Sequence, residues 1–171
     1  MSGSVVYATK YGSTEEYALL MAEKLGIRPL RASEAASEAL KGARYLVLGS
    51  PIYGYSVLPE MEDLLSQCGE IIKDIPTAAF VVCGDTLWNP KAGEGGHRNL
   101  VKLTDLLPAA PFATAVLGGR MVMDQLDDED EPRIRAFYER IGREPTGFDR
   151  MELEKVDPFV AEIKQYLVSG V

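Results

Sequence analysis

The sequence has 171 residues, of which 46% are hydrophobic and 26% are charged, and its formal net charge is −8. This length suits one domain, so we expect residues 1–171 to form a single domain with a sizeable core. The excess of acidic residues argues against nucleic acid as a main partner, because phosphate binding needs clustered lysine and arginine. It also disfavours an anionic membrane surface as a partner.

Few residues could hold a metal ion. The chain has two cysteines, Cys68 and Cys83, a single histidine, His97, and no CxxC motif, so we expect no zinc site. The first residues lack a charged region followed by a long apolar run, so we expect no signal peptide. No apolar run approaches the ~18 residues that span a membrane. These features predict a soluble, cytoplasmic protein.

Apolar runs alternate with helical patterns along the chain. The predicted strands are residues 4–8, 27–31, 44–50, 78–84 and 112–119. All but the short second run are apolar without alternation, as is typical of strands buried on both faces. The predicted helices are residues 14–25, 33–41, 58–68, 98–107, 131–143 and 157 to about 169. This alternation predicts an α/β fold, a three-layer doubly wound domain with a five-stranded parallel sheet.

Loop 1, TKYGST (Thr9–Thr14), follows the first predicted strand. Ligands of doubly wound sheets bind beyond the carboxyl ends of the strands. Gly12 lets backbone amides approach an anion, and a helix N-terminus favours phosphate. Lys10 supplies the one full positive charge, so the loop indicates a mainly neutral phosphate cradle. The alternative is an ordinary turn with Ser13 or Thr14 as the helix N-cap.

Loop 2, SPIYGYS (Ser50–Ser56), follows the third predicted strand. Tyr53 and Tyr55 flank Gly54, which favours a flat wall for a heterocyclic ring. The alternative is that these tyrosines only cover the end of the sheet.

Loop 3, CGDTLWNPKAGEGGHR (residues 83–98), follows the fourth predicted strand and contains the one tryptophan, Trp88. It is long for a strand-to-helix connection, for which about 2–6 residues are typical. Such a loop often covers a ligand, although Trp88 could pack on its own loop instead. The three loops together suit a mononucleotide with a flat, redox-active ring.

The loops resemble those of the flavodoxin family. The family's phosphate signature, T-x-x-G-x-T, stands here as Thr9, Gly12 and Thr14. The resemblance covers nearly the whole chain in element order, and it implies strand order 2-1-3-4-5 and FMN as the cofactor. A looser likeness in residues 47–65 and 116–121 extends to the flavodoxin-domain proteins that include menaquinone-dependent protoporphyrinogen dehydrogenase.

The resemblance also implies which residues contact FMN. Loop 1 would hold the phosphate, while loops 2 and 3 would border the isoalloxazine ring. The implied cofactor-binding residues are Thr9, Lys10, Tyr11, Gly12, Ser13, Thr14, Pro51, Ile52, Tyr53, Gly54, Tyr55, Gly84, Asp85, Thr86, Trp88 and Asn89. No residue is implied as catalytic, because the chemistry of one- or two-electron transfer belongs to the cofactor.

Several functions stay open at this point. The first is an FMN-dependent oxidoreductase with a quinone or another flat acceptor, and the second is a protein-to-protein electron carrier. A receiver-type signalling domain would need paired acids after the first strand, where the sequence has Thr9 and Lys10. A binding module without a cofactor is a further alternative.

Residues 124–131, DQLDDEDE, form the one biased segment of the chain. We expect a solvated loop, with docking of a basic redox partner as the functional alternative. Cys83, at the end of a strand, is expected to be a small buried residue. His97 is expected at the surface or at a helix cap.

Overall fold

The structure is a computed structural model that describes residues 2–35, 37–84 and 92–169, with residues 92–97 described by their backbone alone. A five-stranded parallel sheet forms its centre, with strand order β2-β1-β3-β4-β5. The strands are β1 (Gly3–Tyr7), β2 (Arg28–Arg31), β3 (Tyr45–Pro51), β4 (Thr77–Cys83) and β5 (Ala113–Gly118). This is the flavodoxin-like order that the resemblance implied, and all five predicted strands are confirmed within a residue or so.

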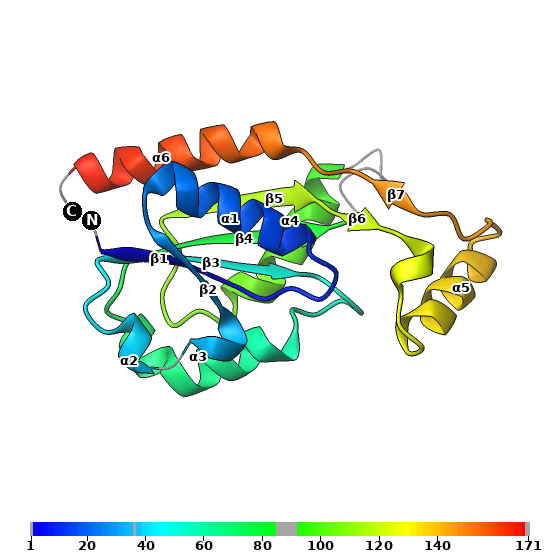
Figure 1. The fold of residues 1–171 in the computed structure, drawn as a ribbon, viewed down its shortest axis with the longest axis horizontal. Helices are drawn as coiled ribbons and strands as arrows, with labels where there is room; N and C mark the ends of the chain where they lie inside the picture. The colour runs from blue at the N-terminus through cyan, green and yellow to red at the C-terminus, as the bar shows by residue number, and fades with distance from the viewer. Residues whose placement is uncertain (1, 36, 85–91, 170–171) are drawn as a thin grey trace.

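Helices cover both faces of the sheet (Figure 1). One face carries α1 (Ser13–Leu25) and α6 (Val156–Val168). The other face carries α3 (Pro59–Ile72) and α4 (Ala92–Thr104), together with the 3-10 turn η1 (Ala32–Glu34) and the short α2 (Ser37–Leu40). The predicted three-layer doubly wound fold is therefore confirmed.

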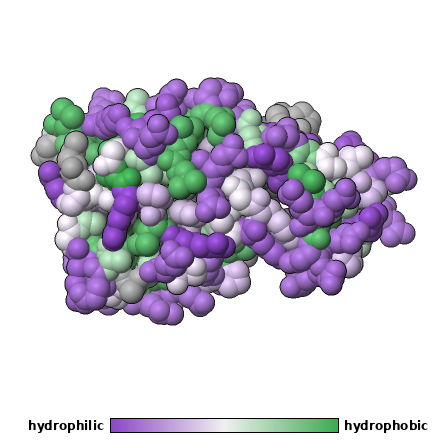
Figure 2. All heavy atoms as spheres, viewed as in Figure 1, coloured by the Kyte–Doolittle hydropathy of each residue, from purple (hydrophilic) through white to green (hydrophobic). Residues whose placement is uncertain are grey.

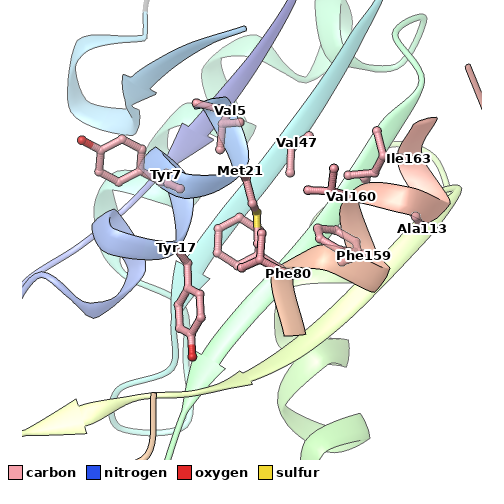
Figure 3. Packing of buried hydrophobic residues seen from close by; sticks show 14 of the residues in the cluster. Val5, Tyr7, Tyr17, Met21, Val47, Phe80, Ala113, Phe159, Val160 and Ile163 are labelled. Atoms are coloured by element: carbon pink, nitrogen blue, oxygen red, sulfur yellow. The ribbon is translucent and has the colours of Figure 1, made fainter. Parts of the chain in front are cut away.

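The two faces of the sheet have separate hydrophobic cores. Every residue of β3 and β4 is buried, which explains why these strands read as continuous apolar runs. Beneath α1 and α6, Phe80 of β4 packs edge-on against Phe159, with ring centroids 6.3 Å apart (Figure 3). A Cβ on Gly49 of β3 would overlap the Phe80 ring, so a glycine is required beside it.

Three helix predictions need correction. The predicted helix over 33–41 is two short pieces, η1 and α2. The α3 helix continues to Ile72, four residues past the predicted end. The α4 helix begins at Ala92 rather than at 98, so the GEGG run of the predicted loop 3 lies within a helix. Glycine disfavours helix by about 1 kcal/mol per residue, which is why the sequence pattern placed this run in a loop.

A segment between β5 and α6 leaves the layered body. We call residues 119–152 the lobe. It contains β6 (Arg120–Met121), the 3-10 turn η3 (Met123–Gln125), α5 (Asp130–Arg140) and β7 (Phe148–Asp149), which pairs antiparallel with β6. A further 3-10 turn, η4 (Leu153–Lys155), leads into α6. The lobe extends beyond the carboxyl ends of the strands (Figure 1), and its surface in Figure 2 is largely hydrophilic.

The two ends of the lobe meet at one buried hydroxyl. Tyr17 of α1 donates a hydrogen bond to the Gly118 carbonyl at 2.9 Å and accepts one from the Glu152 amide at 2.7 Å. Figure 3 shows the Tyr17 hydroxyl pointing away from the surrounding apolar cluster. A Cβ on Gly118 would overlap the carbonyl oxygen of Arg150, so the close approach of the two ends requires glycine there. The sequence pattern predicted α5 but not β6, β7 or this junction.

None of the helices within the described ranges is both long enough and apolar enough to cross a membrane.

Candidate functional site

Loop 1 joins β1 to α1 through a glycine in the left-handed region. Gly12 has φ +94° and is the N-cap of α1, and no side chain among the described residues caps the helix. The Gly12 amide instead donates to Thr9 Oγ1 at 3.1 Å, which closes the loop on itself. The alternative that Ser13 or Thr14 caps the helix is therefore wrong, because both residues lie inside α1.

The first turn of α1 presents unused hydrogen-bond donors. The amides of Ser13, Thr14 and Glu15 bond to no group in the described part of the chain, as expected for a helix start without a side-chain cap. Thr14 is only 1% exposed, and its Oγ1 is buried without a hydrogen-bond partner among the described residues. A buried polar atom without a partner is costly in free energy, so this cluster of donors suits an anion that enters the loop.

Side chains from α3 and β2 hold the start of loop 1. The Thr9 amide donates to Glu60 Oε1 at 2.9 Å, and Arg31 Nη2 donates to the Thr9 carbonyl at 2.9 Å. Arg31 Nε also lies 3.7 Å from Glu60 Oε2. Both backbone groups of Thr9 are thereby fixed by one ion pair. Nothing in the sequence pattern pointed to Glu60 or Arg31, because they are far from loop 1 along the chain.

Lys10 is directed to the lobe rather than to the amides of α1. Its Nζ lies 2.8 Å from Asp127 Oδ2 and 2.6 Å from Asp130 Oδ2. Hydrogen bonds raise the pKa of Lys10, the larger effect coming from Asp127 and the smaller from Asp130. The bond to Lys10 in turn lowers the pKa of Asp127. The donors left around Thr14 carry no full charge, which agrees with a neutral cradle.

The acidic segment 124–131 is largely exposed to solvent, as expected, but it is more ordered than a plain loop, because it contains part of η3 and the start of α5. Four of its six acids form ion pairs: Asp127 and Asp130 with Lys10, and Glu129 and Glu131 with arginines of α5. Asp127 Oδ1 also accepts the Glu129 and Asp130 amides at 3.1 and 2.8 Å, which orders the start of α5. Little unpaired negative charge is left for a basic partner.

Loop 2 is a tight two-residue turn. Tyr53 and Ser56 exchange both backbone hydrogen bonds, at 2.9 and 3.0 Å. The central residues Gly54 and Tyr55 have φ +56° and +69°, as a type I′ turn requires. Tyrosine costs free energy in this conformation, and such strain tends to occur at functional sites. The Tyr55 side chain is held outward, and the residue is 72% exposed.

Loops 1 and 2 meet through their tyrosines. The Tyr11 and Tyr53 rings pack edge to face with centroids 5.9 Å apart. Desolvation raises the pKa of Tyr53 to about 12, although the residue is still 37% exposed. Pro51 is buried at the end of β3, and the amide of the half-buried Ile52 donates to the Val82 carbonyl at 3.0 Å. Tyr53 to Tyr55 therefore face outward, while Pro51 and Ile52 anchor the loop to the sheet.

Gly84 directly follows β4 in loop 3 and is the last described residue before the gap at residues 85–91. Arg150 Nη1 donates to the Gly84 carbonyl at 2.6 Å, and the Arg150 guanidinium stacks 4.4 Å from the Phe148 ring centroid. The lobe thus also reaches loop 3, which the sequence did not predict. The predicted residues Asp85, Thr86, Trp88 and Asn89 lie outside the described residues. Cys83 is buried at the end of β4, as expected.

A cavity of about 220 Å³ lies elsewhere, lined by residues that include Ile75, Thr77, Phe112 and Tyr166. Thr77 begins β4 and Phe112 precedes β5, so this cavity lies at the amino ends of the strands, whereas loops 1 and 2 lie at the carboxyl ends. It shares no residue with the predicted site. No group of histidine, cysteine, aspartate or glutamate side chains in the described ranges could hold a metal ion.

Solved structures with a similar fold include flavodoxins. Flavodoxin 1 from Bacillus cereus shares 18% identity over 96% of this chain and 98% of its own, with a TM-score of 0.59. A short-chain flavodoxin associated with a non-canonical PDU bacterial microcompartment shares 16% identity over 97% of this chain and 99% of its own, with a TM-score of 0.61. Rubredoxin oxygen:oxidoreductase from Desulfovibrio gigas shares 15% identity over 98% of this chain and 36% of its own, with a TM-score of 0.55.

At identities this low, the similarity to these structures establishes the fold and nothing more. No curated protein sequence matches the chain. The sequence model of a flavodoxin domain, however, matches residues 4–145. That range includes loops 1, 2 and 3. The chain therefore belongs to the flavodoxin domain family, whose cofactor is FMN.

Proposed function

We propose that this protein is an electron-transfer protein that binds FMN along the rim formed by loops 1, 2 and 3. The observation that carries the proposal is the buried Thr14 hydroxyl, which has no partner in the described chain and lies beside the unpaired amides of α1. A phosphate group of FMN would accept hydrogen bonds from these donors. Thr9 and Ser13 hydroxyls accept amides in loop 1 and β6, yet each keeps its own O–H to donate.

The remaining predicted residues would serve the ring of FMN. Tyr53 and Tyr55 would border the isoalloxazine ring, and the turn at Gly54 would bring backbone groups close to its edge. Bound FMN supplies one- or two-electron transfer. Pro51, Ile52 and Gly84 would place loops 2 and 3 around the ring. We further infer that residues 1–171 form one flavodoxin-like domain.

We propose a quinone or another flat molecule as the electron acceptor. The ring of Tyr55 supports this choice, because it is exposed on a backbone in the left-handed region and offers a flat surface at the outer edge of the rim. A protein-to-protein carrier is the alternative, and the internal pairing of the acidic segment gives it less support. The likeness to menaquinone-dependent protoporphyrinogen dehydrogenase stays a prediction.

Titration with FMN tests the cofactor. We expect one FMN per chain, with a flavin band near ~450 nm and quenching of tryptophan fluorescence. Trp88 is the one tryptophan in the chain, so any quenching reports on loop 3. Riboflavin, which lacks the phosphate, should bind more weakly than FMN. Absence of bound flavin, or equal affinity for the two flavins, would contradict the proposed site.

Stopped-flow reoxidation tests the acceptor. The FMN-loaded protein is reduced and then mixed with a soluble quinone or with a non-specific one-electron acceptor of similar potential. We expect saturable and faster reoxidation by the quinone. Reoxidation by both acceptors at the same, linearly concentration-dependent rate would favour the protein-to-protein carrier.

A further inference from the structure

The lobe contacts loop 1 at its tip. The Tyr11 hydroxyl donates to Asp130 Oδ2 at 2.6 Å and accepts the Asp127 amide at 3.3 Å. Lys10 donates to the same Asp130 oxygen at 2.6 Å. One carboxylate at the start of α5 therefore binds two consecutive side chains of loop 1.

The lobe also contacts the residues that follow loop 1. The Arg120 amide donates to Ser13 Oγ at 3.2 Å, and Arg120 Nη2 lies 2.6 Å from Glu16 Oε2. One turn further along α1, Tyr17 joins Gly118 to Glu152. Contacts with the lobe thus extend from Lys10 to Tyr17, on both sides of the unpaired amides of α1. The conformation of loop 1 and the packing of the lobe are consequently linked.

The charges at the tip of loop 1 indicate what its contact with the lobe does. Lys10 faces two carboxylates, so moving its ammonium group to a bound phosphate would leave Asp127 and Asp130 without their cation. The contact therefore uses the charge of Lys10 to hold the loop rather than to attract the ligand. A loop that is held in its binding conformation before the ligand arrives loses less conformational entropy on binding.

We propose that Tyr11 and Asp130 are positioning residues, which hold loop 1 in the conformation that binds the FMN phosphate and so couple phosphate binding to the packing of the lobe. This inference rests on the proposed function. Coupling between two sites is reciprocal, so phosphate bound in loop 1 must stabilise the lobe as much as the lobe stabilises the phosphate. Riboflavin lacks the phosphate and would not report the coupling.

Matched variants separate this role from a general effect on folding. Asp130→Ala removes the carboxylate that binds Tyr11 and Lys10, and Asp130→Asn keeps an acceptor oxygen in its place. Tyr11→Phe removes the hydroxyl but keeps the ring that packs against Tyr53. Glu131→Ala is the control, since Glu131 has the same charge and lies in the same turn of α5 but pairs with Arg135 of its own helix.

The first measurement is the affinity of each variant for FMN and for riboflavin. We expect Asp130→Ala and Tyr11→Phe to weaken FMN binding about fivefold, the size of one lost hydrogen bond, with riboflavin binding unchanged. Asp130→Asn should bind FMN nearly as well as the wild type, and Glu131→Ala should be unchanged. An equal loss for both flavins in Asp130→Ala, or the same FMN loss in Glu131→Ala, would overturn the inference.

The second measurement is amide hydrogen exchange of residues 120–150 in the wild type. Inorganic phosphate and FMN should both slow exchange in the lobe, whereas riboflavin should not. Slowing of this segment by riboflavin as much as by FMN would overturn the coupling. If the wild type binds FMN normally but Asp130→Ala keeps the wild-type ratio of FMN to riboflavin affinity, this inference fails and the proposed function stands. If the wild type binds no FMN, both fail.

Discussion

Loop 1 and loop 2 lie at the same rim of the sheet and are held in different ways. Side chains from β2, α3 and the lobe fix loop 1 through Thr9, Lys10 and Tyr11. Loop 2 is closed by two backbone hydrogen bonds of its own, and its central residues face outward. The same rim thus combines two kinds of loop. Loop 1 is fixed by three surrounding elements, which suits a phosphate, and loop 2 presents exposed aromatic rings.

Among the variants that distinguish loop 1 from loop 2, replacement of Gly12 should have the largest effect on FMN affinity. Valine in the left-handed region costs about 1–3 kcal/mol, and in loop 1 the same strain would displace the amides that the phosphate needs. We expect Gly12→Val to weaken FMN binding by at least about tenfold, measured by fluorescence titration. Gly26→Val at the other end of α1 is the matched control, because Gly26 also has a positive φ and open space around it. It should lose similar stability and keep its FMN affinity.

Removal of the Tyr17 hydroxyl tests the support of loop 1 from the lobe. Tyr17→Phe leaves the Gly118 carbonyl and the Glu152 amide without their shared partner, so the free energy of unfolding should fall by about 1–3 kcal/mol. Urea unfolding measures this change. Tyr45 is also buried, and its hydroxyl makes no hydrogen bond within the described ranges. A loss of similar size in Tyr45→Phe would contradict the role of the junction.

Alkaline pH should weaken the same junction. Burial raises the pKa of Tyr17 from 10.0 to about 12, so the folded protein holds this proton more tightly than the unfolded chain. The stabilisation is complete below pH 10 and is lost as the pH rises towards 12, by up to about 1.4 kcal/mol per pH unit for this group. Tyr7 and Tyr53 titrate in the same window. The free energy of unfolding should therefore fall less between pH 9 and pH 11 in Tyr17→Phe than in the wild type.

The neutral character of loop 1 can be tested with two further variants. Thr14→Val removes a buried hydroxyl of nearly the same shape and should weaken FMN binding about fivefold. Lys10→Ala should weaken it less, because Lys10 binds Asp127 and Asp130 rather than the amides of α1. A loss in Lys10→Ala that exceeds the losses in both Thr14→Val and Asp130→Ala would show that the cradle depends on full charge, because Asp130→Ala removes the same contact with the lobe but keeps the ammonium group.

The smallest expected effect concerns loop 2. Asparagine tolerates the left-handed region better than tyrosine, so Tyr55→Asn should raise the free energy of unfolding by about 0.5–1 kcal/mol. The same change removes an exposed ring and should weaken binding of FMN and riboflavin by equal factors. A selective loss of FMN affinity would mean that loop 2, and not only loop 1, recognises the phosphate end of the ligand.

The sequence predicted the parts of this molecule that depend on local pattern. The buried strands are continuous apolar runs, and the occurrence of loops 1, 2 and 3 together at the ends of these strands indicated the family. The lobe could not be predicted in this way. Its strands have two residues each, and its contacts join Lys10 to Asp130 and Tyr17 to Glu152, which are far apart along the chain. Such pairs leave no periodic signal in one sequence, and the acidic run alone resembled a solvated loop.

The junction at Tyr17 has a consequence for the modularity of the chain. One hydroxyl bridges Gly118, where the chain leaves the sheet, and Glu152, where it returns towards α6. The two ends are close enough in space for a short linker to join β5 to η4. The lobe can therefore be regarded as an insert whose length could change without any shift in the strands beneath it, whereas its residues that contact loop 1, such as Asp130, could not be exchanged freely.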